Sequence, residues 1–216
     1  MAAIEDTALA TVALRADAAR NRARIVEAAA EVFAERGLDA STAEVADRAG
    51  VGEATLYRRF PSKDALITAI IATKMEEALA IGEACLREPD PWRGVERFLF
   101  ELAERANRDQ GVSDAAKDSC AASAELMPMR KQMLELCGEL VRRGQRAGVV
   151  RDDVVGQDLI FLLAAAGSLG KLPFPGLRED LWQRYLGLLL DGLRPEGATK
   201  LKPGAPARRL IESPGE

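Results

Sequence analysis

Hydrophobic residues recur along this chain at intervals of three and four, the spacing of one face of an α-helix. Stripes of this kind begin at Ile25, Leu66, Phe98 and Met127, and two further apolar segments cover 159–167 and 181–193. Gly37 stands where the first stripe stops, as glycine commonly does just after a helix. The pattern predicts an all-α fold of about nine helices.

Two short helices around a glycine are predicted between the first stripe and the second. Ser41 and Glu44 have capping-box spacing, in which a hydroxyl and a carboxylate each accept an N–H at the start of a helix. Gly50 gives the permissive backbone that a sharp turn requires. The next helix starts near Glu53 and must end before Pro61, because proline disfavours helical geometry in the residue before it.

The second short helix has two unlike faces. Leu56 and Phe60 share one face at four-residue spacing and should anchor the helix inward. The opposite face is small or polar. A helix of two turns is unstable in isolation. A short helix that its neighbours hold in place, with its polar side presented to a DNA groove, explains the pattern better than a purely structural role. This arrangement is typical of the helix-turn-helix motif that reads DNA.

The stretch Thr55-Leu56-Tyr57, followed by an aromatic residue and Pro61-Ser62-Lys63-Asp64, resembles the TetR family of bacterial transcription regulators over about residues 19–66. The resemblance implies an all-helical homodimer with an N-terminal DNA-binding domain of three helices. It also implies a larger C-terminal domain that binds a small molecule and thereby releases the DNA.

The resemblance assigns DNA contacts to residues of this stretch. Thr42 and Tyr57 match family residues that contact DNA phosphates, and Lys63 matches a basic residue that binds the DNA backbone. Glu53 and Ala54 stand where the family reads bases, so they could meet a cytosine amino group and a thymine methyl group. The full expected set is Thr42, Ala43, Gly52, Glu53, Ala54, Thr55, Tyr57, Arg58, Arg59 and Lys63.

Other roles for three of these residues stay open from the sequence. Thr42 could simply cap a helix, Tyr57 could be a packed ring, and Glu53 could be an acid favoured by the helix dipole. The chain also departs from the family: Gly52 stands where serine is frequent, Ala43 where some members read a base, and Arg59 where histidine is common. These departures bear on the operator sequence rather than on the mode of binding.

Composition narrows the classes of function. The chain has 216 residues, 48% of them hydrophobic, and a net charge of -4, so any basic DNA-binding surface must be local. It contains no histidine, which removes Ser-His-Asp and Cys-His catalytic sites and the commonest metal ligand. We therefore expect neither an enzyme nor a cofactor. Residues 1–14 lack the basic flank of a signal peptide, so we expect a cytoplasmic protein without a membrane segment.

The second half of the chain favours a ligand pocket and a dimer interface. The methionine-rich helix near 127–141 could line a pocket for an apolar effector, although an ordinary core also explains it. The candidate pocket residues are Phe98, Leu102, Met133, Cys137 and Phe161. The segments 159–167 and 181–193 carry more apolar surface than one contact can hide, which predicts a homodimer through the last two helices.

Four segments are expected: a flexible N-terminal arm (1–15), a DNA-binding domain (16–64), a ligand-binding and dimerisation domain (65–194) and a disordered tail (195–216). The function expected is a repressor that a small molecule releases from a palindromic double-stranded operator. Two alternatives stay open, a constitutive DNA-binding regulator and a helical ligand-binding protein.

Overall fold

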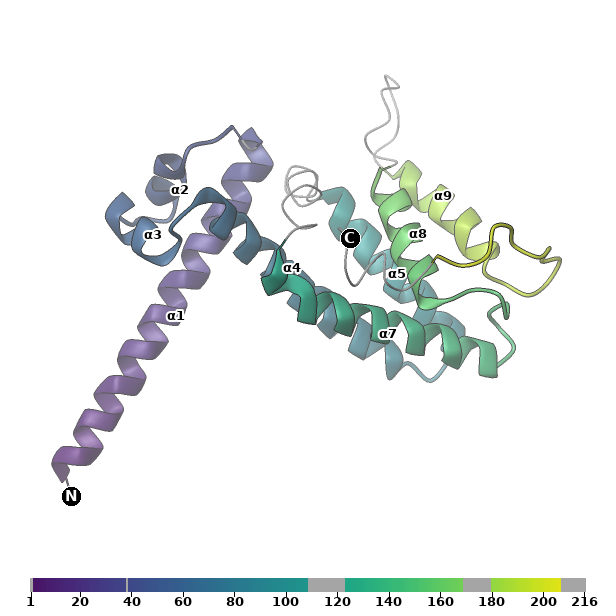
Figure 1. Cartoon of the computed structure of the whole chain (residues 1–216), viewed down its shortest axis with the longest axis horizontal. Coiled ribbons are helices and arrows are strands. Elements are labelled where there is room, and N and C mark those ends of the chain that lie inside the picture. Colours follow the sequence, from purple (N-terminus) through teal and green to yellow (C-terminus); the bar gives the residue numbers. More distant parts are fainter. Residues whose placement is uncertain (1, 38, 109–122, 169–179, 207–216) are drawn as a thin grey trace. The chain divides into compact units, whose positions relative to one another are not determined.

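The computed structural model describes residues 2–37, 39–108, 123–168 and 180–206, with side chains from residue 16 onward. Every regular element in these ranges is helical, which confirms the predicted all-α fold (Figure 1). The first elements are α1 (Ala2–Arg36), α2 (Thr42–Arg48), α3 (Glu53–Arg59) and α4 (Lys63–Leu86). They are followed by α5 (Pro91–Arg108), a 3-10 turn at Ala124–Leu126, α7 (Met127–Arg146), α8 (Gly156–Ser168) and α9 (Leu181–Asp191). The short helix expected from Gly111 lies outside the described residues.

The described chain divides into two compact units, one ending at Ile71 and the other beginning at Ala72. This division lies inside α4, a few residues beyond the boundary expected after residue 64. At the N-terminus, α1 extends back to Ala2 through the segment predicted to be a flexible arm. That segment is rich in alanine, the residue with the highest intrinsic helix propensity.

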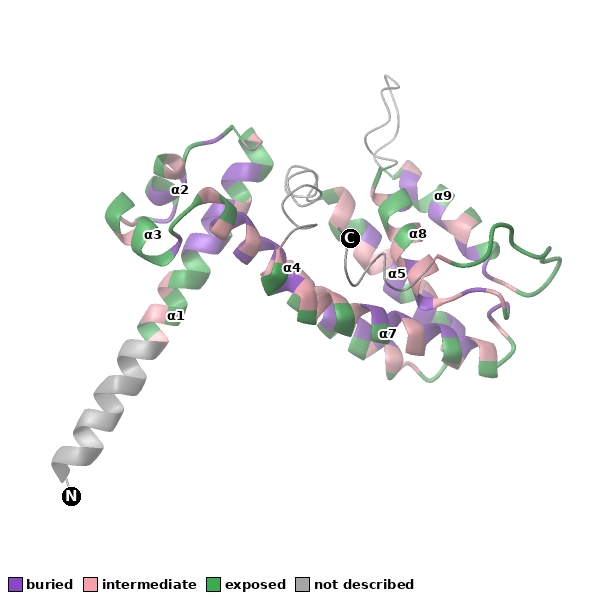
Figure 2. Ribbon diagram, viewed as in Figure 1, coloured by how far each residue is buried: buried purple, intermediate pink, exposed green. Residues whose placement is uncertain are grey.

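The core of the first unit is built from the apolar face of each of its helices. Ile25, Ala29 and Phe33 of α1 are almost fully buried, as are Val45 of α2 and Leu56 of α3. Figure 2 shows buried segments, in purple, on these helices. α2 packs against both α1 and α3. The three-helix arrangement therefore follows the stripes seen in the sequence.

The second unit has its own core around α8, which packs against α5, α7 and α9. Phe98 and Leu99 of α5 and Leu140 of α7 are buried in it, together with Leu159 of α8. Gly156 at the start of α8 lies so close to the α7 backbone that a Cβ atom there would sit 2.5 Å from the amide nitrogen of Gly138. Glycine is therefore required where these two helices cross.

Two cysteines belong to the second core and are inert in it. Cys85 and Cys137 are both fully buried and free. Burial raises the pKa of the Cys137 thiol to about 12, and it also raises the pKa of Cys85. Since the thiolate is the reactive form of cysteine, both residues act as small core side chains.

A C-terminal strap, residues 193–201, is fastened to the loop between α7 and α8. The buried Arg151 forms a two-pronged ion pair with Asp153 (2.6 and 3.0 Å) and also donates to the carbonyl groups of Gly192 and Thr199. Asp153 in turn accepts the N–H of Leu201 at 3.0 Å. Thr199 and Leu201 are held by these bonds, whereas the sequence predicted a disordered tail from residue 195; residues 207–216 lie outside the described residues.

Replacing Arg151 by Met should lower the melting temperature by several degrees, because it leaves Asp153 and two carbonyl groups without their shared donor. Arg142→Met is the matched control, since Arg142 forms an exposed ion pair with Glu139 in the same unit and should shift the melting temperature by no more than about a degree. Equal shifts for the two variants, measured by thermal unfolding, would mean that the strap adds no stability.

The same pair predicts how this stability depends on pH. The Arg151 guanidinium lowers the pKa of Asp153 to about 2. A carboxyl group with a lowered pKa in the folded state stabilises the protein above its ordinary pKa and loses that effect as the pH falls through the lowered value. The difference in melting temperature between the wild type and Arg151→Met should therefore persist from neutral pH to about pH 4 and shrink toward pH 2.

Candidate nucleic-acid interface

The start of α2 is fixed by the capping box that the sequence predicts. The Ser41 hydroxyl accepts the N–H of Glu44 at 3.3 Å, and the Glu44 carboxylate accepts the N–H of Ser41 at 2.8 Å. These bonds from Ser41, with a smaller contribution from Arg36, lower the pKa of Glu44. Glu44 is therefore ionised at neutral pH, and its carboxylate binds both Ser41 and Arg36. These contacts fix the direction of α2 relative to the end of α1.

The turn between α2 and α3 depends on one glycine. Gly50 has a φ of 63°, in the left-handed region that favours glycine. The N–H of Val51 bonds the carbonyl of Ala46, and the N–H of Gly50 bonds that of Asp47, both at 3.0 Å. This pair of bonds is the Schellman motif that ends helices. It stops α2 and redirects the chain into α3.

The orientation of α3 is set by its two large apolar residues. Leu56 and Phe60 are 1% and 3% exposed, so they fix one side of this seven-residue helix against the core. The other side faces solvent and carries the exposed residues Glu53, Ala54, Tyr57, Arg58 and Arg59, with Thr55 half-buried. Gly52 precedes the helix without a side-chain cap, in agreement with the absence of a serine there. The structure thus leaves the expected DNA-reading residues of α3 accessible to solvent.

The predicted phosphate contacts Thr42 and Tyr57 meet directly. Their hydroxyl oxygens lie 2.7 Å apart, which joins the first residue of α2 to the middle of α3. The Tyr57 side chain is 47% exposed, which does not fit the alternative of a packed ring. Thr42 and Ala43 lie at the same end of α2, and Ala43 is exposed.

Lys63 is placed differently from the other expected contacts. Its ammonium group donates to the carbonyl of Ala40 at 2.8 Å and lies 5.3 Å from the centre of the Phe33 ring. Lys63 therefore connects the start of α4 to the α1–α2 loop. A phosphate would have to share this ammonium group with the Ala40 carbonyl, and a role in DNA binding stays a prediction.

Several other basic residues of the first unit are bound by acids. Arg48 is paired with Glu31 and Glu35 at 3.1 and 2.7 Å, which raises the pKa of Arg48 and lowers that of Glu35. Arg36 is paired with Glu44 and Arg20 with Asp17. Arg22 instead rests on the ring of Phe60, with its guanidinium carbon 5.4 Å from the ring centre. The contact of Arg22 with the end of α3 was not among the sequence-based assignments.

The candidate pocket residues fall into two groups. Phe98 and Cys137 are fully buried in the core of the second unit, and Leu102 and Met133 are partly buried against it. Phe161 is 50% exposed and does not belong to this cluster. It lies instead on an outward stripe of α8 with Ala164 and Ala165, both exposed. The structure thus brings four of the five residues to one core and places the fifth on the surface.

The outward faces of α8 and α9 carry the large exposed apolar side chains found on the described helices of the second unit. Phe161 of α8 is accompanied by Tyr185 (41% exposed) and Leu188 (58% exposed) of α9, and these helices pack against each other. We call these three residues the α8–α9 apolar surface. Within the described ranges, no three acidic or cysteine side chains are grouped so as to hold a metal ion. None of the described helices is long and apolar enough to cross a bilayer.

Comparison with protein families identifies both halves of the chain. Residues 25–70 match the family model of bacterial regulatory proteins of the tetR family, and residues 90–195 match the C-terminal domain of SbtR-like transcriptional regulators. The repressor KstR2 of Rhodococcus jostii is 41% identical over 184 residues, covering 80% of this chain and 90% of that protein. The repressor BepR of Brucella suis is 31% identical over 147 residues, covering 62% of this chain and 70% of that protein.

Solved structures agree with these matches over most of the chain. The TetR transcriptional regulator SCO0520 from Streptomyces coelicolor is 30% identical and superimposes with a TM-score of 0.62, covering 82% of this chain and 99% of the other. A TetR regulatory protein from Mycobacterium vanbaalenii is 33% identical with a TM-score of 0.61, covering 84% of this chain and 99% of the other.

The bond between Thr42 and Tyr57 predicts that their effects on binding to duplex DNA are coupled. Thr42→Val and Tyr57→Phe each remove one hydroxyl, and each leaves the other hydroxyl without its partner. The double variant should therefore lose less affinity than the product of the single losses, by a factor of about 3 or more. Titration of a fluorescent duplex with the four proteins measures this factor. Independent, multiplicative losses would mean that the two hydroxyls act separately.

Proposed function

Because the chain belongs to the TetR family of bacterial transcription regulators, we propose that it is a homodimeric repressor that leaves its DNA operator when it binds a small apolar molecule. Membership in the family makes it a DNA-binding transcriptional regulator rather than an enzyme. The exposed face of α3, held outward by Leu56 and Phe60, is the single observation on which the proposal rests most directly.

In this proposal α3 enters the major groove and its first turn reads bases. Glu53 and Ala54 are exposed and Thr55 half-buried there, while the glycine cap leaves room for close approach of the backbone. The proposed phosphate-binding residues are Arg58, Arg59 and the hydrogen-bonded pair of Thr42 and Tyr57. Lys63 and Ala43 are proposed to lie at the edge of the protein–DNA contact. These ten residues stay the proposed DNA-binding set.

The homodimer is proposed to form through the α8–α9 apolar surface. Exposed apolar patches that are rimmed by polar residues commonly mark interaction sites. Two helices from each subunit would form a four-helix interface about a twofold axis. Such a dimer presents two copies of α3, so the operator is proposed to be a palindrome with half-sites one or more helical turns apart.

The effector is proposed to bind in the second unit, near Leu102 and Met133. These two partly buried side chains lie against the core that contains Phe98 and Cys137, and methionine adapts to irregular apolar surfaces. Phe161 is exposed, so we propose that it belongs to the dimer interface at the α8–α9 apolar surface and not to the effector site. One solved relative, KstR2 of Mycobacterium tuberculosis, is described as a ketosteroid transcriptional regulator, and a steroid is largely apolar. Cytoplasmic location is part of the proposal, since the operator is chromosomal DNA.

Selection from a library of random duplexes tests the proposed function. The wild-type protein should enrich a palindromic sequence and bind it as two chains per duplex. Glu53→Ala, an exposed change in the first turn of α3, should alter the base preferred at one position of each half-site and leave the rest of the sequence intact. Enrichment of no sequence would contradict the proposal, and enrichment of the same sequence by both proteins would remove Glu53 from base reading.

The dimer interface is tested by charge at its centre. Leu188→Glu places a carboxylate on the most exposed of the three apolar side chains, so the isolated subunit should keep its fold while the dimer dissociates. We expect a monomer by sedimentation and a loss of operator affinity. Gln183→Glu, an exposed position of the same helix outside the apolar surface, is the control and should remain dimeric. A dimeric Leu188→Glu protein would place the interface elsewhere.

A further inference from the structure

Arg22 differs from its neighbour Arg24 in its position around the α1 helix. Arg22, Val26, Ala29 and Phe33 follow one another at helical spacing, and the last three are buried. Arg22 therefore continues the packed stripe of α1 by one further turn. Arg24 lies about 160° away around the helix axis, as two steps of an α-helix dictate, and shares an exposed face with Glu27 and Glu31.

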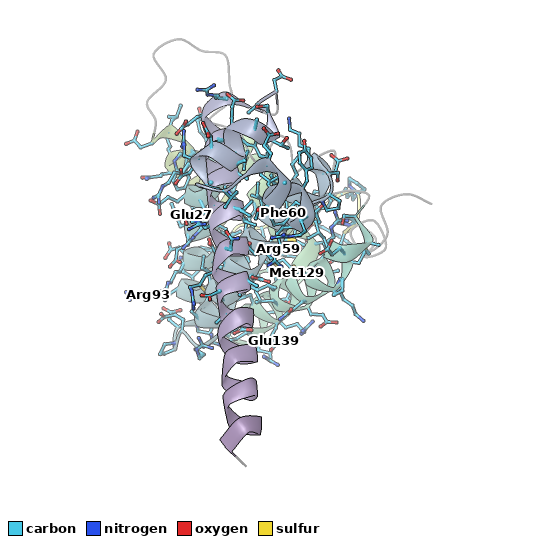
Figure 3. The ribbon with its side chains drawn as sticks, turned by 90° about the vertical axis from the view of Figure 1, so that its left-hand side faces the viewer. Glu27, Arg59, Phe60, Arg93, Met129 and Glu139 are labelled. Atoms are coloured by element: carbon cyan, nitrogen blue, oxygen red, sulfur yellow. The ribbon has the colours of Figure 1, made fainter. Side chains whose placement is uncertain are left out.

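The end of the recognition helix α3 meets this continued stripe. The Arg22 guanidinium lies 5.4 Å from the centre of the ring of Phe60, the residue at which α3 ends. Phe60 itself is 3% exposed, while Arg22 remains exposed to solvent. Figure 3 shows Glu27 and Phe60 on opposite sides of the α1 ribbon, with Arg59 on the side of Phe60. A cation held over an aromatic face loses part of its freedom and keeps its N–H donors available at the edge.

Within the part of the chain that the structure describes, no carboxylate pairs with Arg22, unlike several basic residues around it. Arg20, Arg36 and Arg48 are paired with carboxylates. Lys63 is bound to the Ala40 carbonyl and lies over Phe33. Arg24 donates to the neutral amide of Asn21 at 3.1 Å and so keeps its full charge, but on the opposite side of α1. Near α3, the described residues therefore offer three guanidinium groups without a carboxylate partner, those of Arg22, Arg58 and Arg59, in addition to the ammonium group of Lys63.

We propose that Arg22 of α1 is a DNA phosphate-binding residue, held by the ring of Phe60 beside the last turn of α3. Resting on the proposed DNA-binding function, this assignment adds a contact from outside the helix-turn-helix itself. α3 contributes base-reading residues from its first turn and two arginines from its last. A third guanidinium at that end extends the phosphate contact from α3 to α1.

The salt dependence of binding tests this assignment. Each phosphate contact contributes about 0.9 to the slope of log affinity against log salt, so a dimer that loses two contacts loses about 1.8. Arg22→Met keeps the apolar stem and removes the charge. Its affinity deficit relative to the wild type should then shrink by about 12-fold between about 50 mM and about 200 mM salt. Arg24→Met removes the same charge from the opposite side of α1 and should leave the slope unchanged.

Two further measurements separate a DNA contact from a structural role. Arg22→Lys restores the charge and should restore the slope, although lysine lacks the planar group that stacks on Phe60. The melting temperature shows whether each variant is folded. A folded Arg22→Met protein with the wild-type slope, or equal slope changes for Arg22→Met and Arg24→Met, would overturn the assignment while the proposed function stands. A wild-type protein without salt-dependent binding to duplex DNA would overturn both.

Discussion

The burial of Leu56 and Phe60 is the constraint on which the proposed DNA-binding surface depends. A helix of seven residues cannot persist alone, so α3 exists because these two side chains are packed into the first unit. Their four-residue spacing fixes which side of the helix faces inward. The opposite side is then exposed as a rigid unit, with acidic and small residues in its first turn and two arginines in its last.

The rest of the first unit restricts how that exposed side can move. The Schellman motif at Gly50 fixes the angle between α2 and α3, and the capping box at Ser41 fixes the start of α2. The bond between Thr42 and Tyr57 ties α2 to α3 at the surface, and Lys63 ties the start of α4 to the α1–α2 loop. Since all of these links form within the first unit itself, α3 is oriented before any duplex is bound. Preorganised contacts of this kind reduce the entropy lost on binding.

The sequence predicted those features that follow from local rules. The capping box, the glycine turn, the end of α3 before Pro61 and the inward face of α3 all depend on residues within about one helical turn of each other. Contacts between distant residues were not accessible in this way. The pairing of Thr42 with Tyr57, the position of Lys63 over Phe33 and the contact of Arg22 with Phe60 depend on how helices cross, which spacing alone does not give. The stripe that begins at Ile25 was visible in the sequence, but its continuation to Arg22 gained a meaning only from the position of α3.

The second unit shows the same limit. Apolar stripes correctly indicated that its helices pack together, yet Phe161 was assigned to a pocket and lies exposed on α8. A helix that is apolar on every side does not reveal which side meets the core. The C-terminal strap escaped prediction because its order comes from the buried Arg151 and from Asp153, which bind backbone groups some 40 to 50 residues away.

The central claim is that the exposed face of α3 enters the major groove twice, once from each subunit. Interference with binding by methylation of guanine N7, a major-groove atom, tests it most directly on the selected operator. We expect interference in two patches on one face of the duplex, centred about 10 base pairs or a multiple of that apart. Binding that is unaffected by N7 methylation throughout a guanine-containing operator, or affected in one patch only, would contradict the account.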